Sequence, residues 1–131
     1  MLPLAPGAAY AELPPEDFES CLFDLINQER AKAGIGALTM TAVVNSQART
    51  WSKWMSENEL RHTTDSERAA LLPDWDVFTE ENIAWNSDPD LEDCKAIHDR
   101  LMGGSSQHRA NILDGTARFV GLGAHVDRSG W

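Results

Sequence analysis

Two histidines and one glutamate, far apart in the sequence, are the side chains best suited to carry chemistry. His62 lies in an Arg-His-Thr-Thr stretch, Glu81 opens Glu-Asn-Ile-Ala, and His108 opens His-Arg-Ala-Asn-Ile-Leu. Imidazole and carboxylate groups bind divalent metals or exchange protons near neutral pH. If the fold brings these three segments together, we expect a functional site there.

Three interpretations of this trio stay open from the residues alone. Two imidazoles and a carboxylate are a known catalytic zinc set, in which His62 and His108 bind the metal and Glu81 is base or third ligand. In the second, Glu81 accepts a hydrogen bond from one imidazole and fixes its orientation. In the third, His62 caps the end of one helix and His108 is a satisfied polar residue at the start of another.

Length and charge limit the class of protein. A chain of 131 residues suits one domain, and its net charge of −10 comes from 21 acidic and 11 basic residues. The acids are dispersed, which is typical of a solvated surface. Nucleic-acid binding is not expected, because phosphate contacts need clustered Lys and Arg. No apolar run approaches the roughly 20 residues of a membrane-spanning helix, so no span is predicted.

The first residues differ from the rest of the chain. Residues 1–11 are mildly apolar, lack a basic residue and end in Ala9-Tyr10-Ala11, an Ala-x-Ala of the kind that precedes signal cleavage. An unstructured leader or an artificial remnant would also fit. We favour the remnant of an export signal over residues 1–14, followed by one domain over residues 15–131, and hence a secreted or extracytoplasmic location.

The two cysteines, Cys21 and Cys94, either pair or remain buried thiols. A disulfide between them would close a loop of about 73 residues and stabilise the fold by about 4 kcal/mol on the chain-entropy model. Each cysteine lies on the apolar stripe of a predicted helix. We favour the disulfide, which would tie the first helix to the third.

Hydrophobic spacing, capping residues and turn residues predict the elements that must position these side chains. Helices are expected over residues 16–33, 41–60 and 89–102 and from about residue 108, with one helical turn at 66–72, a connector at 35–38, and strands at 81–85 and 119–126. Gly103-Gly104 should end the third helix, and Ser105-Ser106 should cap the fourth. Asn27 and Arg30 are expected to bond the loop near Leu38.

The end of the chain suggests an incomplete sheet. A hairpin turn at residues 127–130 is followed only by Trp131, where a returning strand would normally begin. We therefore expect an unpaired edge beside Val120–Val126, open to strand addition from another chain or to self-association.

Four segments together resemble the CAP superfamily, also called SCP-like, which includes cysteine-rich secretory proteins and many bacterial exported domains. They are Leu25–Arg30 with Gly34 and Leu38, Arg61–Thr63, Glu81–Ala84 with Glu80 where the family has glycine, and His108–Leu113 followed by Val120–Gly123. The resemblance covers the chain from about Asp17 to Trp131.

This resemblance implies an α+β fold, an α–β–α sandwich with a small antiparallel sheet between helices and the final strand absent. It also implies a cleft holding His62, Glu81 and His108, and zinc bound through the two histidines. A second family glutamate is expected near residues 101–105, and none is there. This departure weakens an acid–base role more than metal binding.

Three functions follow as expectations. The first is an exported binding domain for a small lipid, an envelope component or a protein partner, with zinc as candidate cofactor. The second is a zinc-dependent hydrolase using His62, His108 and Glu81. The third is an interaction module that recruits a strand at its open sheet edge.

Overall fold

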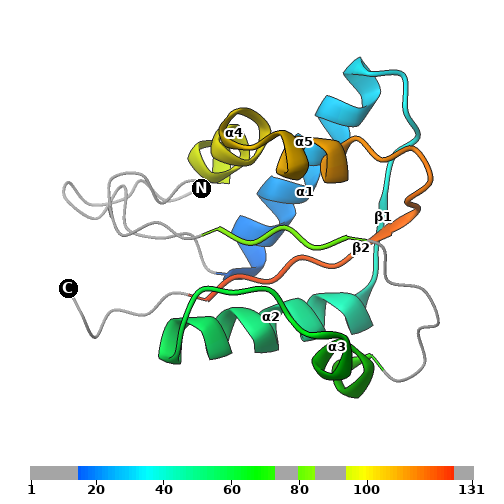
Figure 1. Cartoon of the computed structure of the whole chain (residues 1–131). Helices are drawn as coiled ribbons and strands as arrows, with labels where there is room; N and C mark the ends of the chain where they lie inside the picture. The colour runs from blue at the N-terminus through cyan, green and yellow to red at the C-terminus, as the bar shows by residue number, and fades with distance from the viewer. Residues whose placement is uncertain (1–14, 73–79, 85–93, 126–131) are drawn as a thin grey trace.

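A computed structural model describes residues 15–72, 80–84 and 94–125, and within them the chain is mostly helical with a small sheet (Figure 1). The elements are α1 (Pro15–Lys32), β1 (Thr39–Met40), α2 (Ala42–Glu57), α3 (Asp65–Leu71), α4 (Cys94–Gly104), α5 (Ser106–Ile112) and β2 (Phe119–Val120). The expected leader at residues 1–14 and the end of the expected sheet edge at Val126 lie outside the described residues.

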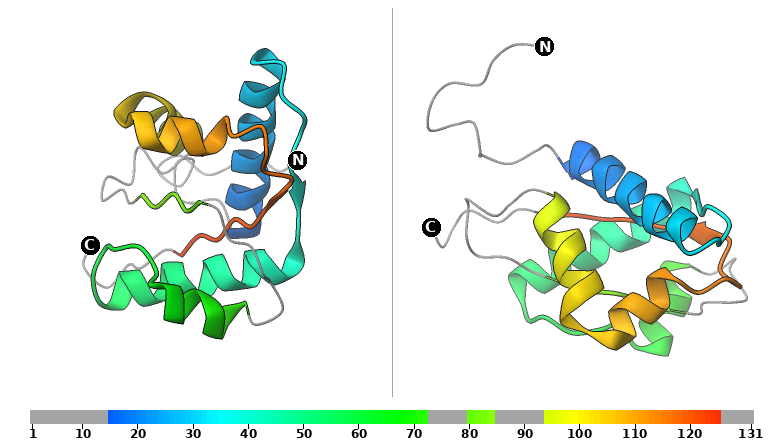
Figure 2. Two further views of the ribbon diagram at one scale, coloured as in Figure 1. Left: turned by 45° about the vertical axis from the view of Figure 1, so that its right-hand side comes forward. Right: turned by 90° about the horizontal axis from the view of Figure 1, so that it is seen from above.

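The elements are arranged in layers. Helices α1, α4 and α5 lie on one side, and α2 and α3 lie on the other (Figures 1 and 2). Two extended segments, residues 80–84 and 119–125, run between these groups of helices. Extended chain between two helical layers is what the sandwich expectation required.

The prediction of an antiparallel sheet is wrong. Strands β1 and β2 pair in parallel, with Thr39 opposite Phe119 and Met40 opposite Val120. The reason is that β1 lies just after the predicted connector, where a two-residue strand leaves no period-two pattern to detect. Residues 81–84, which were predicted to begin a strand, form no ladder in the described structure.

Beyond Val120, side chains of α2 replace a strand as hydrogen-bond partners. The backbone N–H of Leu122 donates to Asn45 Oδ1 at 2.7 Å, and Ser52 Oγ donates to the carbonyl of Gly123 at 2.8 Å. These bonds satisfy backbone groups that would otherwise need a ladder. Within the described residues, the predicted strand 119–126 is therefore a two-residue strand that continues to residue 125 as an extended segment docked on a helix.

The two glycines of this segment are required by its closeness to α2. A Cβ atom on Gly121 would overlap Val44, and one on Gly123 would overlap the backbone of Ala48 and Arg49. Only a residue without a side chain allows such an approach of two backbones. The Val-Gly-Leu-Gly pattern is thus explained by packing.

Glu19 on α1 fastens the same segment from the other side. Its side chain is 3% exposed, accepts Arg49 Nε at 2.8 Å, and accepts the backbone N–H of Ala124 at 3.1 Å. The expectation that the acidic residues form a solvated surface is wrong for this one. A buried carboxylate persists because a guanidinium and an amide satisfy it.

Asn27 and Arg30 bond the loop that follows α1, as predicted. Asn27 Nδ2 donates to the carbonyl of Leu38 at 3.2 Å, while the N–H of Leu38 donates back to Asn27 Oδ1 at 2.8 Å. Arg30 Nε donates to the carbonyl of Gly36 at 2.8 Å. The helix stops before Gly34, whose φ of 73° is the left-handed conformation typical of a C-terminal glycine.

Arg30 also reaches the far end of α5. Its guanidinium donates from Nη1 to the carbonyls of Ile112 at 2.9 Å and Asp114 at 2.8 Å, and from Nη2 to that of Ala117 at 3.2 Å. The residue is only 1% exposed. One buried cation therefore joins the first helix to a loop more than eighty residues later.

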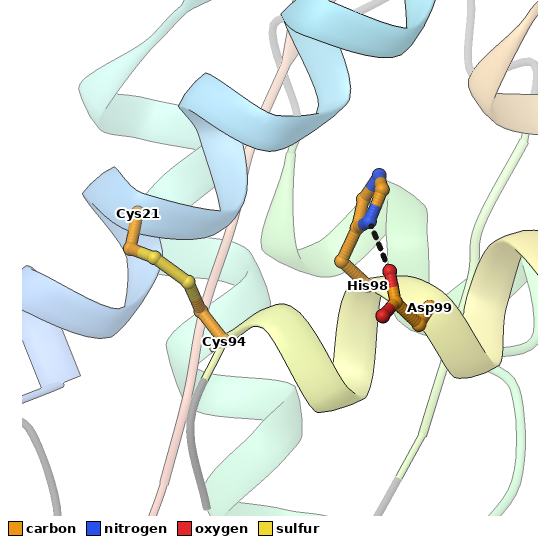
Figure 3. The surroundings of a disulfide bond; sticks show 4 residues. All are labelled: Cys21, Cys94, His98 and Asp99. Carbon is orange, nitrogen blue, oxygen red and sulfur yellow. Dashed lines mark hydrogen bonds and ion pairs between the residues drawn. A yellow bond between two sulfur atoms is a disulfide. The ribbon is translucent and has the colours of Figure 1, made fainter.

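The expected disulfide is present. Cys21 on α1 and Cys94 on α4 are bonded, with their Cα atoms 6.1 Å apart (Figure 3). The bond lies beside the hydrophobic core, whose buried members are Leu22, Ile26, Leu38, Cys94, Leu101 and Ile112.

Within the described residues, no helix has the length and apolar character needed to cross a membrane.

The short helices have well-formed ends. Thr64 and Glu67 form a reciprocal capping box at the start of α3, and Ser105 caps α5 by accepting the N–H of His108 at 3.4 Å. Helix α4 includes both Gly103 and Gly104 and ends at the second, so the predicted break falls at the end of the glycine pair.

Candidate functional site

The structure brings His62 and Glu81 into direct contact. His62 Nδ1 lies 2.8 Å from Glu81 Oε1. The next residue, Thr63, donates from its backbone N–H to the same oxygen at 2.9 Å and from its hydroxyl to Oε2 at 2.7 Å. The imidazole is half exposed, with 55% of its side-chain surface open, whereas Glu81 is 13% exposed. A mostly buried carboxylate thus lies behind an accessible ring.

This contact fixes which ring nitrogen bears the proton. A carboxylate only accepts hydrogen bonds, so Nδ1 of His62 is the donor and Nε2 of the neutral ring carries the free lone pair. That nitrogen can bind a metal or accept a proton. The arrangement is the second of the three interpretations drawn from the sequence.

The segment that carries His62 is held by two tryptophans of α2. The rings of Trp51 and Trp54 stack at 4.5 Å, and the guanidinium of Arg61 lies 4.8 Å and 4.4 Å from their centroids. Trp51 Nε1 also donates to the carbonyl of Arg61 at 2.9 Å. The Arg61 side chain forms an ion pair with Glu67 of α3 at 2.8 Å. Arg61 therefore links α2 to α3 on either side of His62.

His108 lies in the first turn of α5 and is half-buried. Its carbonyl accepts Asn82 Nδ2 at 3.0 Å, and Asn82 Oδ1 accepts Asn111 Nδ2 at 2.8 Å. Consecutive residues, Glu81 and Asn82, thus hold the two histidine-bearing segments.

The part of the chain that the structure describes contains no metal-binding group of three. Across residues 15–72, 80–84 and 94–125, no three His, Cys, Asp or Glu side chains are arranged to hold one ion. Glu81 already accepts three hydrogen bonds from His62 and Thr63. The zinc ligand set of His62 and His108, and a catalytic role for Glu81, stay predictions.

A pair of acids, Glu80 beside Glu81 in the sequence and Asp114 after α5, was not predicted from the sequence. Burial, and then the hydrogen bond and negative charge of Asp114, raise the pKa of Glu80 to about 7. The hydrogen bond from Glu80, and then those from Thr116, lower the pKa of Asp114 to about 2. At pH values below about 7, Glu80 thus carries the proton of the hydrogen bond between the two carboxyl groups. The partners lie on separate segments, so no local pattern in the sequence could have revealed them.

His98, the remaining histidine of the helical region, is structural as expected. It is 4% exposed, and its Nδ1 lies 3.2 Å from Asp99 Oδ1 (Figure 3). Its Nε2 lies 3.9 Å from Glu29 Oε1 across the contact between α1 and α4. The ring is enclosed between α1 and α4.

Comparisons with known proteins agree with this architecture. The crystal structure of a cysteine-rich secretory protein from Staphylococcus aureus superposes with a TM-score of 0.63 at 17% sequence identity, covering 86% of this chain. This chain spans 37% of the length of that protein, and the low identity supports the fold alone. The comparison with curated proteins gives no match.

The sequence itself carries the family assignment. Residues 23–131 match the family described as CAP, the cysteine-rich secretory protein family. The match includes both histidine segments and the Glu-Asn pair between them. This chain is therefore a member of the CAP superfamily.

Proposed function

We propose that this chain is an exported CAP domain that acts by binding, with the His62–Glu81 pair and the first turn of α5 at its binding site. The ligand class is a small lipid, an envelope component or a protein partner. Proteins of this family are typically secreted, and the Cys21–Cys94 disulfide is consistent with an extracellular location.

The observation that carries the proposal is how fully Glu81 is engaged by its own protein. A carboxylate has about four lone-pair positions, and three of those of Glu81 accept bonds from Thr63 and His62. A general base or third metal ligand needs an open lone pair directed at its target. Glu81 is better suited to orient His62 than to act on a substrate, which favours binding over hydrolysis.

Zinc is the candidate ion for this proposal because of the form of the His62 contact. Ligating histidines commonly donate their other ring N–H to a carboxylate, which orients the ring and raises its basicity. His62 with Glu81 behind it has this form, and His108 would be the second ligand. A bound zinc ion would supply a Lewis acid that polarises an oxygen of the ligand. His62 and His108 would hold it, while Thr63 and Glu81 keep the first ring in place.

Calorimetric titration with zinc chloride tests the metal part. The comparison is between wild type, a His62→Ala, His108→Ala double variant, and His125→Ala, which changes an exposed histidine outside the predicted ligand set. We expect wild type and His125→Ala to bind equally and the double variant to lose binding. Equal affinity of all three proteins would remove the metal from the proposal.

A second set of measurements tests ligand binding itself. A fluorescent fatty acid and soluble peptidoglycan fragments are titrated into wild type and His62→Ala, with hydrolysis of each followed in the same samples. We expect saturable binding of one probe without turnover, weakened by the substitution. No binding of either probe would count against the lipid and envelope ligands, and turnover that depends on His62 would favour the hydrolase instead.

A further inference from the structure

Thr63 donates a hydrogen bond to each oxygen of the Glu81 carboxylate. Its backbone N–H reaches Glu81 Oε1 and its hydroxyl reaches Oε2, at 2.9 Å and 2.7 Å. Thr63 is 5% exposed, so neither bond competes freely with water. Two donors from one residue fix both the position and the rotation of the carboxylate that His62 contacts.

Arg68 in turn donates a hydrogen bond to the hydroxyl of Thr63. From α3, its Nη1 donates to the carbonyl of Thr63 at 2.8 Å and to Thr63 Oγ1 at 3.0 Å. Arg68 also forms an ion pair with Asp65, one helical turn before it. The Arg68 guanidinium is therefore held both by Asp65 of its own helix and by Thr63, the residue that follows His62.

These contacts give the hydrogen bonds a single direction. A guanidinium has no acceptor, so the Thr63 hydroxyl must accept from Arg68 and use its one proton to donate to Glu81. Bonds arranged in such a series polarise one another, so the bond from Arg68 makes the Thr63 hydroxyl a stronger donor to Glu81. Glu81 is left as a fixed acceptor facing His62 Nδ1.

We propose that Thr63 and Arg68 are positioning residues that, acting through Glu81, hold the His62 ring in the Nδ1–H tautomer and leave Nε2 as the ligand-facing nitrogen. The use of Nε2 by a ligand rests on the proposed function. The tautomer itself does not rest on the proposed function. It is set in the ligand-free protein by the contacts among His62, Glu81, Thr63 and Arg68.

Long-range proton–nitrogen NMR of the His62 ring tests this in the ligand-free protein, at a pH above the usual imidazole pKa of about 6.5. Glu81→Ala defines the signal when the acceptor is gone. We expect wild type and Thr63→Ser to show the Nδ1–H tautomer. We expect Thr63→Val, which keeps the shape but loses the hydroxyl, to shift toward the Nε2–H form.

Arg68→Met provides an independent variant, because it leaves Thr63 intact but frees its hydroxyl to rotate. If Thr63→Val does not fold, Arg68→Met decides alone by the same measurement. Wild-type tautomer in each folded variant, or no shift in Glu81→Ala, would overturn the proposal.

If zinc binds wild type, Thr63→Val and Arg68→Met are each expected to weaken the zinc affinity about 10- to 100-fold. Failure of zinc to bind wild type would count against the proposed metal and leave the tautomer result standing.

Discussion

Replacing Arg30 by methionine should destabilise the fold more than any other single change at a charged residue of α1. Methionine keeps much of the apolar stem but removes every donor. Four carbonyls lose the guanidinium, those of Gly36, Ile112, Asp114 and Ala117. The Asp114 carbonyl keeps a second donor, the backbone N–H of Ala117 at 3.2 Å. The bond to Ile112 is buried and the other three are partly buried.

The expected loss can be estimated from these environments. A buried acceptor left without a partner costs about 1–3 kcal/mol, and a partly buried one costs less because water can replace the donor. Taken together, and allowing for incomplete additivity, Arg30→Met should lower the free energy of unfolding by about 3–5 kcal/mol. For a domain of this size, that corresponds to a fall in Tm of about 10–20 °C.

Thermal and urea unfolding followed by circular dichroism measure this loss. Arg118→Met is the matched control, because Arg118 is exposed and follows directly after Ala117. It should change stability by no more than about 0.5 kcal/mol. Arg30→Lys keeps the charge but not the planar fork, so it should recover only a minor part of the loss. The reasoning would be refuted if Arg30→Met and Arg118→Met unfolded at the same temperature.

Three further predictions concern other parts of the fold. Gly123→Ala should cost about 2–3 kcal/mol, because its Cβ would overlap the α2 backbone, while Gly115→Ala, which has room, should cost almost nothing in the same unfolding assay. The Glu80 carboxyl, with its pKa raised from 4.5 to about 7, stabilises the fold at low pH and loses that contribution as pH rises through about 7. The stability of wild type relative to Glu80→Gln should therefore fall over this range, and parallel pH curves would contradict the raised pKa of Glu80. A Cys21→Ser, Cys94→Ser double variant should lose about 4 kcal/mol, and dithiothreitol should lower the Tm of wild type but not of the variant.

The sequence predicted the helices well because their signals are local. The apolar spacing of α1, the exit at Gly34 and the cap at Ser105 depend on residues within a turn or two of each other. The loop contacts of Asn27 and Arg30 were also predicted in kind. The carbonyls of Ile112, Asp114 and Ala117 were not, because nothing near Arg30 indicates which distant loop will return to it.

The strands and the site were only partly predictable for the same physical reason. Strand β1 is two residues long, so its direction relative to β2 could not be inferred from either segment. The contact between His62 and Glu81 was one of several alternatives, and only the fold selects it. The pairing of Glu80 with Asp114 depends on burial as well as proximity, and neither is written in the order of the residues.

The docking of residues 121–124 has a consequence for how this domain can vary. The backbone there is held by Asn45, Ser52 and Glu19, so its attachment is specified by residues elsewhere in the chain. These bonds reach backbone groups, so they do not depend on the side chains of the docked stretch, although Leu122 also packs against the core. A substitution at Asn45 would remove one of these attachments without altering a residue of the stretch itself. The position of this segment therefore depends on α2, a helix some seventy residues earlier in the chain.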